Sequence, residues 1–205
     1  TCCFINDAKE ESVNTILEMA EYKKSGSCKV LIVTGCMAQR YKNEIIDEVP
    51  EVDAVLGTTS YGDILKAVNE AMEGKHFQEF KDIDYLPEKL GKRVLTTGGH
   101  FGYLKIAEGC DKHCTYCIIP KLRGRFRSVP MERLLEQAQE MAEQGVKELI
   151  LVAQETTVYG TDIYGKKSLH VLLKELCRIK GIRWIRVLYC YPEEIYDELI
   201  QTMKE

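Results

Sequence analysis

GYLKIAEGCDKHCTYC, residues 102–117, is the stretch of this sequence that decides the fold. Its first half, residues 102–109, has the composition of a short strand that leads directly into a loop. The loop places Cys110, Cys114 and Cys117 at CxxxCxxC spacing. In folds built from parallel strands, ligands bind at the loops that follow the carboxyl ends of the strands. We therefore expect a binding site that these three thiols share.

The number of cysteines in this loop favours an iron–sulfur cluster over zinc. A structural zinc site uses four protein ligands. A cubane cluster has four irons, so three thiolates leave one iron open to a small molecule. The alternative is a zinc site completed by His113, but His113 and Cys114 are adjacent in sequence and adjacent residues rarely converge on one metal.

The rest of the chain alternates between strand and helix patterns. Before the loop, the periodicity predicts helices over 7–26, 39–49 and 61–74, and strands over 29–36 and 52–58. After the loop it predicts helices over 129–145, 168–181 and 193–205, and strands over 147–154 and 182–192. This alternation predicts an α/β protein: an open parallel βα sheet, then part of a barrel or of a doubly wound sheet.

Residues 74–98 interrupt the alternation, because they are polar, contain Pro87 and several glycines, and lack a helical period. We predict a first domain over 1–84, a linker or hairpin over 85–98 and a second domain over 99–205. In the hairpin, residues 93–97 would pair with residues 102–109.

The composition excludes few classes of protein. The chain has 205 residues, of which 45% are hydrophobic and 29% charged, with a net charge of −4, so a basic surface for non-specific nucleic-acid binding is not expected. It has no run of apolar residues long enough to span a membrane and no signal-peptide pattern at its start, so we expect a cytoplasmic protein. Of its nine cysteines, Cys28, Cys177 and Cys190 are predicted to be small buried hydrophobes.

The cysteine loop and its flanks, YLKIAEGCDKHCTYCIIPKLRGRFRS, resemble the radical S-adenosylmethionine (radical SAM) superfamily, and in particular its methylthiotransferase branch. The resemblance implies that Cys110, Cys114 and Cys117 hold a [4Fe–4S] cluster whose open iron binds SAM. Electron transfer to SAM then generates a 5′-deoxyadenosyl radical. The resemblance also places Tyr116 against the adenine, although packing in the core is the alternative.

Two N-terminal segments resemble the family's second cluster site. TCCFINDAKEES implies that Cys2 is a ligand and that Cys3 is a bystander, and VTGCMAQRY implies that Cys36 is a ligand. The family's remaining cysteine belongs upstream, and its barrel continues beyond three βα units. We therefore expect an internal fragment, with an incomplete N-terminal domain and the first half of a radical SAM partial barrel, that is inactive in isolation.

Two further segments resemble the RimO type of methylthiotransferase. They are VAQETTVYGTD (152–162) and RVLYCYPEEIYDELI (186–200). That type adds a methylthio group to the β-carbon of an aspartate in the twelfth small-subunit ribosomal protein. One alternative is the branch that modifies an adenosine of transfer RNA, the only interpretation that involves nucleic acid. The other is a non-catalytic zinc-binding module.

The remaining site residues and partners follow from position and from the resemblance. Gln154 and Glu155 end a strand, so they either reach the methionine moiety of SAM or the substrate, or cap the next helix or loop. Arg123, in the basic segment 121–127, is either a cofactor-binding residue or part of a solvated loop. The tyrosines near strand ends, Tyr159, Tyr189 and Tyr191, either line the pocket or are buried, and burial is the expected outcome. The resemblance implies a flavodoxin- or ferredoxin-like electron donor and no membrane partner.

Overall fold

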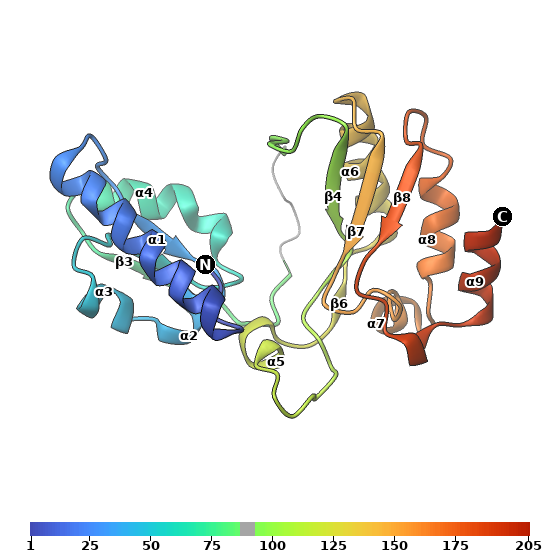
Figure 1. The fold of residues 1–205 in the computed structure, drawn as a ribbon, viewed down its shortest axis with the longest axis horizontal. Coiled ribbons are helices and arrows are strands. Elements are labelled where there is room, and N and C mark those ends of the chain that lie inside the picture. Colours follow the sequence, from blue (N-terminus) through green and yellow to red (C-terminus); the bar gives the residue numbers. More distant parts are fainter. Residues whose placement is uncertain (87–92) are drawn as a thin grey trace. The chain divides into compact units, whose positions relative to one another are not determined.

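The computed structural model describes residues 1–86 and 93–205 of the chain (Figure 1). The described residues form two compact units. The first unit consists of residues 1–86 together with Lys112–Gly124, and the second unit of residues 93–111 together with Arg125–Glu205. Among the described residues, no helix is long and apolar enough to cross a membrane.

The first unit is built on a three-stranded parallel sheet in the order β1-β2-β3. The strands are β1 (Ile32–Thr34), β2 (Ala54–Leu56) and β3 (Phe77–Glu79). The helices are α1 (Asn6–Ser25), α2 (Cys36–Tyr41), α3 (Glu44–Glu48), α4 (Ile64–Met72), which follows a 3-10 turn at Tyr61–Asp63, and α5 (Ile119–Arg123).

Alternating residues of these strands pack on two separate cores. Val33 and Val55 pack with Ile16 of α1. Ala54, the neighbour of Val55 in β2, packs instead with Ala67 of α4. Because successive side chains of a strand point to opposite faces, α1 and α4 cover opposite faces of the sheet. The central strand β2, Ala54–Leu56, is apolar throughout because both of its faces are buried.

Two details of the first unit differ from the sequence-based expectation. Strand β3 lies in the segment from residue 74, where no regular element was predicted. Its three residues, of which Gln78 is exposed, are too few for a periodic signal. The helix predicted over 39–49 is interrupted at Lys42, whose backbone has a φ of 47°. This left-handed conformation ends α2 and separates it from α3.

The second unit contains a parallel sheet in the order β4-β7-β8. Its strands are β4 (Phe101–Lys105), β7 (Glu148–Val152) and β8 (Trp184–Val187), and a short antiparallel pair joins β5 (Ala107–Glu108) to β6 (Arg127–Ser128). Its helices are α6 (Met131–Glu143), α7 (Thr161–Tyr164), α8 (Leu169–Leu176) and α9 (Asp197–Lys204), the last preceded by a 3-10 turn at Pro192–Glu194.

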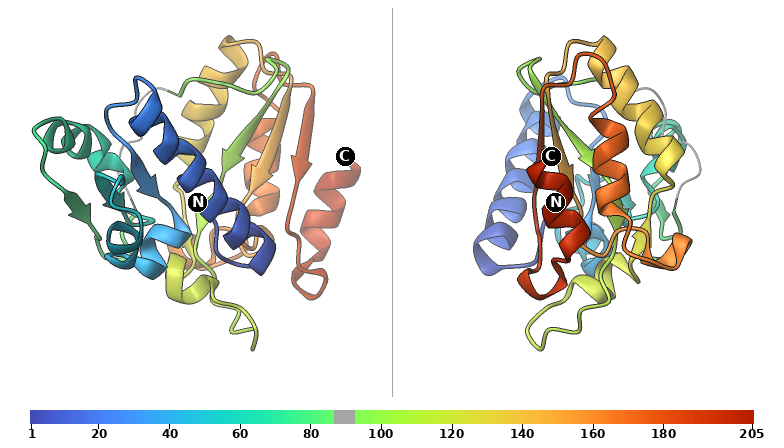
Figure 2. Two further views of the ribbon diagram at one scale, coloured as in Figure 1. Left: turned by 60° about the vertical axis from the view of Figure 1, so that its left-hand side comes forward. Right: turned by 90° about the vertical axis from the view of Figure 1, so that its right-hand side faces the viewer.

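Helices α6 and α8 lie on one face of this sheet (Figure 2). Leu134 of α6 and Leu172 of α8 are fully buried there against Leu149 and Leu151 of β7. The two parallel sheets and the helices that connect their strands confirm the predicted α/β class.

The predicted hairpin before the second domain is not formed. Residues 93–100 contain no strand, and β4 pairs with β7 rather than with them. Part of the predicted linker, residues 87–92, lies outside the described residues. Thr97 instead donates a hydroxyl hydrogen bond to the carbonyl of Phe101 at 2.6 Å, which turns the chain into β4.

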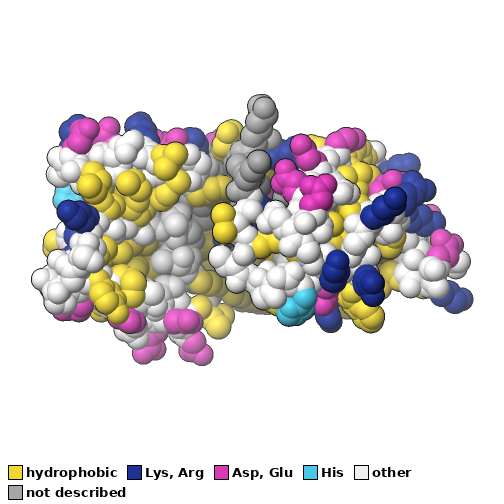
Figure 3. Space-filling model, turned by 90° about the horizontal axis from the view of Figure 1, so that it is seen from above, with side chains coloured by type: hydrophobic (Ala, Val, Ile, Leu, Met, Phe, Trp, Pro, Cys, Tyr) yellow, Lys and Arg dark blue, Asp and Glu magenta, His cyan; other side chains and the backbone are white. Residues whose placement is uncertain are grey.

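The charged side chains of both units are mixed in sign across the surface shown in Figure 3. This mixture is what a net charge of −4 over 60 charged residues predicts, from 28 Lys and Arg and 32 Asp and Glu.

Tyr159 is the large polar side chain at the centre of the second unit. Its ring is 0% exposed and its hydroxyl donates to the carbonyl of Val129 at 2.8 Å. It was expected to be buried, and this is confirmed. Burial raises the pKa of Tyr159 well above its ordinary value.

Replacing Tyr159 with Phe should destabilise the protein by about 1–2 kcal/mol at neutral pH, because the Val129 carbonyl then loses its partner. The raised pKa favours the neutral ring in the folded state. The stability that the neutral Tyr159 ring contributes is therefore complete below about pH 10, the pKa of tyrosine in the unfolded chain, and is lost as the pH rises above that value.

Urea unfolding at neutral pH and above pH 10 should show that Tyr159→Phe removes part of the loss of stability at alkaline pH. A matched control is Tyr189→Phe, since Tyr189 is 66% exposed. Equal alkaline losses in wild type and Tyr159→Phe would contradict this prediction.

Candidate functional site

The two ends of the cysteine loop are paired with each other in the second unit. Strand β4 runs into β5, and Gly109, with a φ of 76°, then turns the chain to Cys110. The antiparallel pairing of β5 with β6 brings the two ends of the loop together. The carboxylate of Asp111 accepts a hydrogen bond from the backbone N–H of Phe126 at 3.1 Å. The β5–β6 pair and this hydrogen bond together hold the two ends of the loop side by side.

The middle of the loop, Lys112–Gly124, belongs to the first unit. Leu122 of α5 is 6% exposed and packs in the core that contains Met37 of α2. The hydroxyl of Thr58 donates to the carbonyl of Leu122 at 2.8 Å. Cys110 thus belongs to the second unit, and Cys114 and Cys117 to the first. The spacing of the motif gives no sign of this division.

The three thiols of the motif differ in exposure. Cys110 is buried, Cys114 and Cys117 are half-buried, and none of them is in a disulfide. A turn brings the backbone N–H of Cys117 to the carbonyl of Cys114 at 3.0 Å. Over the described part of the chain, no three His, Cys, Asp or Glu side chains are gathered closely enough to hold a metal ion. The donors fit an iron–sulfur cluster chemically, because they are soft, unoxidised thiols on one loop.

Tyr116 and His113, the aromatic residues between these cysteines, are both exposed. The ring of Tyr116 is 82% exposed, so the interpretation of Tyr116 as a core residue is wrong. His113 also lies at the surface. The role of Tyr116 beside the adenine remains a prediction.

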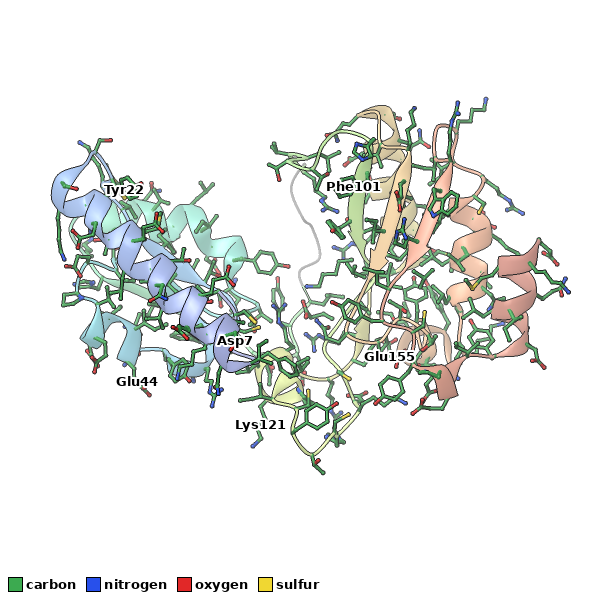
Figure 4. All side chains as sticks on the ribbon, viewed as in Figure 1. Asp7, Tyr22, Glu44, Phe101, Lys121 and Glu155 are labelled. Carbon is green, nitrogen blue, oxygen red and sulfur yellow. The ribbon has the colours of Figure 1, made fainter. Side chains whose placement is uncertain are left out.

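Gln154 and Glu155 follow the carboxyl end of β7 (Figure 4). Glu155 is 2% exposed, and its Oε1 accepts hydrogen bonds from the backbone N–H of Thr157 at 3.0 Å and from the Thr157 hydroxyl. Oε1 of Glu155 therefore caps the turn that follows β7, which is one of the two interpretations drawn from the sequence. The other carboxylate oxygen, Oε2, and Oε1 of Gln154 are buried without a hydrogen-bond partner. Such oxygens are rare in proteins and indicate either strain or a ligand that is absent.

Thr156 joins this turn to the end of β8. Its hydroxyl donates to the carbonyl of Leu188 at 2.8 Å, and its backbone N–H donates to the carbonyl of Tyr189 at 3.1 Å. Tyr189 has a φ of 60° and a ring that is 66% exposed, so the expectation that it is buried is wrong. Tyr191 is half-buried. The carboxyl ends of β7 and β8 therefore form one connected edge.

The N-terminal residues lie beside the end of β1. The amino group and hydroxyl of Thr1 each donate to the carbonyl of Thr34 at 2.8 Å, and the N–H of Cys36 donates to the carbonyl of Thr1 at 3.1 Å. Gly35, with a φ of 107°, allows this approach, because a Cβ there would lie 2.7 Å from the Thr1 carbonyl oxygen. Backbone hydrogen bonds thus bring the segment that contains Cys2 to Cys36, as the proposed second cluster requires.

The three cysteines of this region have different surroundings. Cys2 is exposed, and its backbone is tied to the hydroxyl of Ser12 by bonds of 2.9 and 3.0 Å. Cys36 is half-buried. Cys3 is 3% exposed in the apolar core, where burial raises the pKa of its thiol. The soft donors Cys2 and Cys36 fit a cluster in part, since they supply two of the three ligands that it needs.

Arg123 was predicted to bind a cofactor or to lie in a solvated loop. The structure places it at the end of α5, half-buried, with its Nε–H donating to Sγ of Cys36 at 3.2 Å. The sequence contains no signal for this contact, because the two residues are 87 positions apart.

The cysteines expected to be buried hydrophobes are mostly not buried. Cys177 and Cys190 are exposed, and Cys28 is half-buried. The prediction was wrong for the two exposed residues because Cys177 follows the end of α8 and Cys190 follows β8, where the core no longer covers the chain.

Comparison with known proteins gives two family matches. Residues 1–57 match the family described as Uncharacterized protein family UPF0004, and residues 104–205 match the Radical SAM superfamily. The second match includes all three cysteines of the CxxxCxxC motif.

Curated relatives match the chain over its whole length. It is 68% identical over 204 residues to a protein of Lachnoclostridium phytofermentans named Ribosomal protein uS12 methylthiotransferase RimO, and 58% identical over 205 residues to a Clostridium botulinum protein of the same name. These alignments cover 100% and 99% of the chain, but 46% of each relative. The chain therefore spans about half the length of the curated relatives that it matches.

One solved structure has a similar fold. It is the cobalamin-dependent S-adenosylmethionine radical enzyme OxsB with aqua-cobalamin and S-adenosylmethionine bound, with a TM-score of 0.52 and 16% identity. The likeness covers 97% of the chain and 31% of the OxsB chain, and at this identity it supports the fold alone. The matches to the relatives and to both families agree with the cysteine motif: residues 104–205 belong to the Radical SAM superfamily, and the whole chain is similar to proteins named RimO methylthiotransferase.

Proposed function

We propose that this chain is part of a radical SAM methylthiotransferase that adds a methylthio group to the β-carbon of an aspartate in ribosomal protein uS12. Relatives with 68% and 58% identity carry the name of that activity. The segments 152–162 and 186–200, which favour the RimO type, end β7 and β8 at the edge described above.

The observation that carries the proposal is the pair of buried oxygens without partners at this edge. β4 and β7 are parallel neighbours, so the chain leaves both strands at the same end of the sheet. β4 leads to Cys110, and β7 leads to Gln154 Oε1 and Glu155 Oε2. An edge with a cluster ligand and two acceptors suits a ligand that has a cationic amino group and also binds iron. The methionine moiety of SAM has both properties.

Each residue then has a defined task. When bound, the cluster and SAM supply a carbon-centred radical that can abstract a hydrogen atom from an unactivated carbon. Cys110, Cys114 and Cys117 hold the cluster. Glu155 and Gln154 accept hydrogen bonds from the ammonium group of SAM, and the exposed ring of Tyr116 is available to stack on its adenine.

The N-terminal cysteines complete the proposal. Cys2 and Cys36, with a third cysteine from outside this sequence, would hold a second cluster, which would be the source of the sulfur, and a second SAM would be the source of the methyl group. A flavodoxin- or ferredoxin-like protein supplies electrons. The backbone pairing of Thr1 with Thr34 and Cys36 supports this arrangement because it holds the Cys2 segment beside Cys36.

The test uses the full-length protein, reconstituted with iron and sulfide without oxygen and then reduced. We expect an electron paramagnetic resonance signal that changes shape when SAM is added, and mass spectrometry that finds one methylthio group on an aspartate of uS12. A signal that does not respond to SAM would overturn the proposal. So would bound zinc without iron, or a methylthio group found only on transfer RNA.

A further inference from the structure

We propose that Arg123 is a positioning residue for the second cluster: its Nε–H hydrogen bond to the sulfur of Cys36 raises the reduction potential of the cluster bound there. The inference rests on the proposed function, because it requires that Cys36 is a cluster ligand. It goes further by giving a role to a residue on the loop that carries Cys114 and Cys117.

The contact is direct and belongs entirely to the first unit. Nε of Arg123 lies 3.2 Å from Sγ of Cys36, within the range of a hydrogen bond to sulfur. Both side chains are half-buried. In such surroundings a charge-assisted hydrogen bond is stronger than at an exposed site, because water competes less for the donor and the local dielectric constant is lower.

The position of Arg123 is determined by the packing of α5. Leu122, its neighbour, is buried in the core next to α2, and the Leu122 carbonyl accepts the 2.8 Å bond from Thr58. Gly124, with a φ of 72°, ends the helix immediately after Arg123. The backbone of Arg123 is therefore held in place by Leu122 before it and by Gly124 after it. Its contact with Cys36 follows from this fold of the loop.

Hydrogen bonds to cluster sulfurs are one of the factors that set the reduction potential of an iron–sulfur cluster. A reduced cluster carries one more negative charge than an oxidised cluster. A cationic N–H donor on a ligand sulfur stabilises that charge, so it favours the reduced form. Removing the donor should shift the midpoint potential to more negative values.

Arg40 provides a matched control. It lies on α2, four residues after Cys36, and it is exposed. Its guanidinium donates to the carbonyl of Cys3 at 3.5 Å, and not to the sulfur of Cys36. Arg40→Gln therefore removes the same charge from the same unit but leaves the N–H···S bond intact.

The experiment is a redox titration, followed by electron paramagnetic resonance, of the full-length protein with Cys110, Cys114 and Cys117 changed to Ala, so that only the second cluster forms. In Arg123→Gln, we expect the ratio of reduced to oxidised cluster at a fixed potential to fall about tenfold, which corresponds to about 59 mV for one electron. Arg40→Gln should leave this ratio nearly unchanged. Arg123→Lys keeps the charge but has carbon at the position of Nε, so its potential should also fall, by a smaller amount.

Three results would overturn the inference. The first is a wild-type potential in both Arg123 variants, or in Arg123→Lys alone if Arg123→Gln binds no cluster. The second is an equal shift in Arg40→Gln and Arg123→Gln, which would indicate a general effect of charge. The third is an unchanged iron and sulfide content in Cys36→Ala. That result would exclude a cluster on Cys36, and it alone would also overturn this part of the proposed function.

Discussion

Cys114→Ala is expected to abolish the SAM-dependent chemistry of the full-length protein. With two thiols left on the loop, the cluster loses one of its three protein ligands, and an open iron for SAM is no longer maintained. We expect reductive cleavage of SAM to 5′-deoxyadenosine to fall by at least about 10³-fold, since this step depends wholly on the cofactor. Chromatography of the 5′-deoxyadenosine formed under anaerobic, reducing conditions measures the loss.

Cys177→Ala is the matched control for this loss. Cys177 is exposed, follows the end of α8, lies outside the cysteine loop and is in no disulfide. It should leave the cleavage rate within about twofold of wild type, because an exposed thiol outside the metal site adds little. A Cys114→Ala protein that still cleaves SAM at the wild-type rate would exclude Cys114 as a ligand. Unchanged helix content by circular dichroism would separate loss of the cluster from loss of the fold.

Glu155→Gln is expected to weaken SAM binding and to stabilise the protein. In wild type, one carboxylate oxygen is held by Thr157, and the other is buried without a partner. A buried polar oxygen without a partner costs about 1–3 kcal/mol, more when it is charged. Glutamine keeps the oxygen that accepts from Thr157 and removes the charge. The melting temperature should therefore rise by a few degrees.

The affinity for SAM should change in the opposite direction. Losing a charge-assisted hydrogen bond to the ammonium group of SAM should raise Kd by about 10- to 100-fold. Isothermal titration calorimetry of the reconstituted protein measures Kd, and differential scanning calorimetry measures the melting temperature. Glu143→Gln, an exposed change on α6, is the control and should alter neither quantity. Unchanged affinity together with a lower melting temperature would show that Glu155 has only a structural role.

Much of this protein can be predicted from its sequence, because the signals that matter are local. Helical periodicity predicts both ends of α1 and α6 closely, but for α8 only the start, because that helix ends at Leu176 rather than at residue 181. Apolar runs predict the strands β1, β2, β7 and β8, of which β2 and the centre of β7 are buried on both faces. The CxxxCxxC spacing predicts Cys110, Cys114 and Cys117 as ligands of the proposed first cluster without any knowledge of the fold.

The tertiary structure decided what depends on residues far apart in the chain. The segment Lys112–Gly124 belongs to the first unit because Leu122 is buried there and Thr58, 64 residues earlier, binds its carbonyl. The contact of Arg123 with Cys36 spans 87 residues. The exposure of the Tyr116 ring and the lack of a hydrogen-bond partner for Glu155 Oε2 also depend on how segments that are distant in the sequence pack. Spacing and periodicity describe neighbours along the chain, whereas burial and hydrogen bonding between distant segments arise only when the whole chain packs.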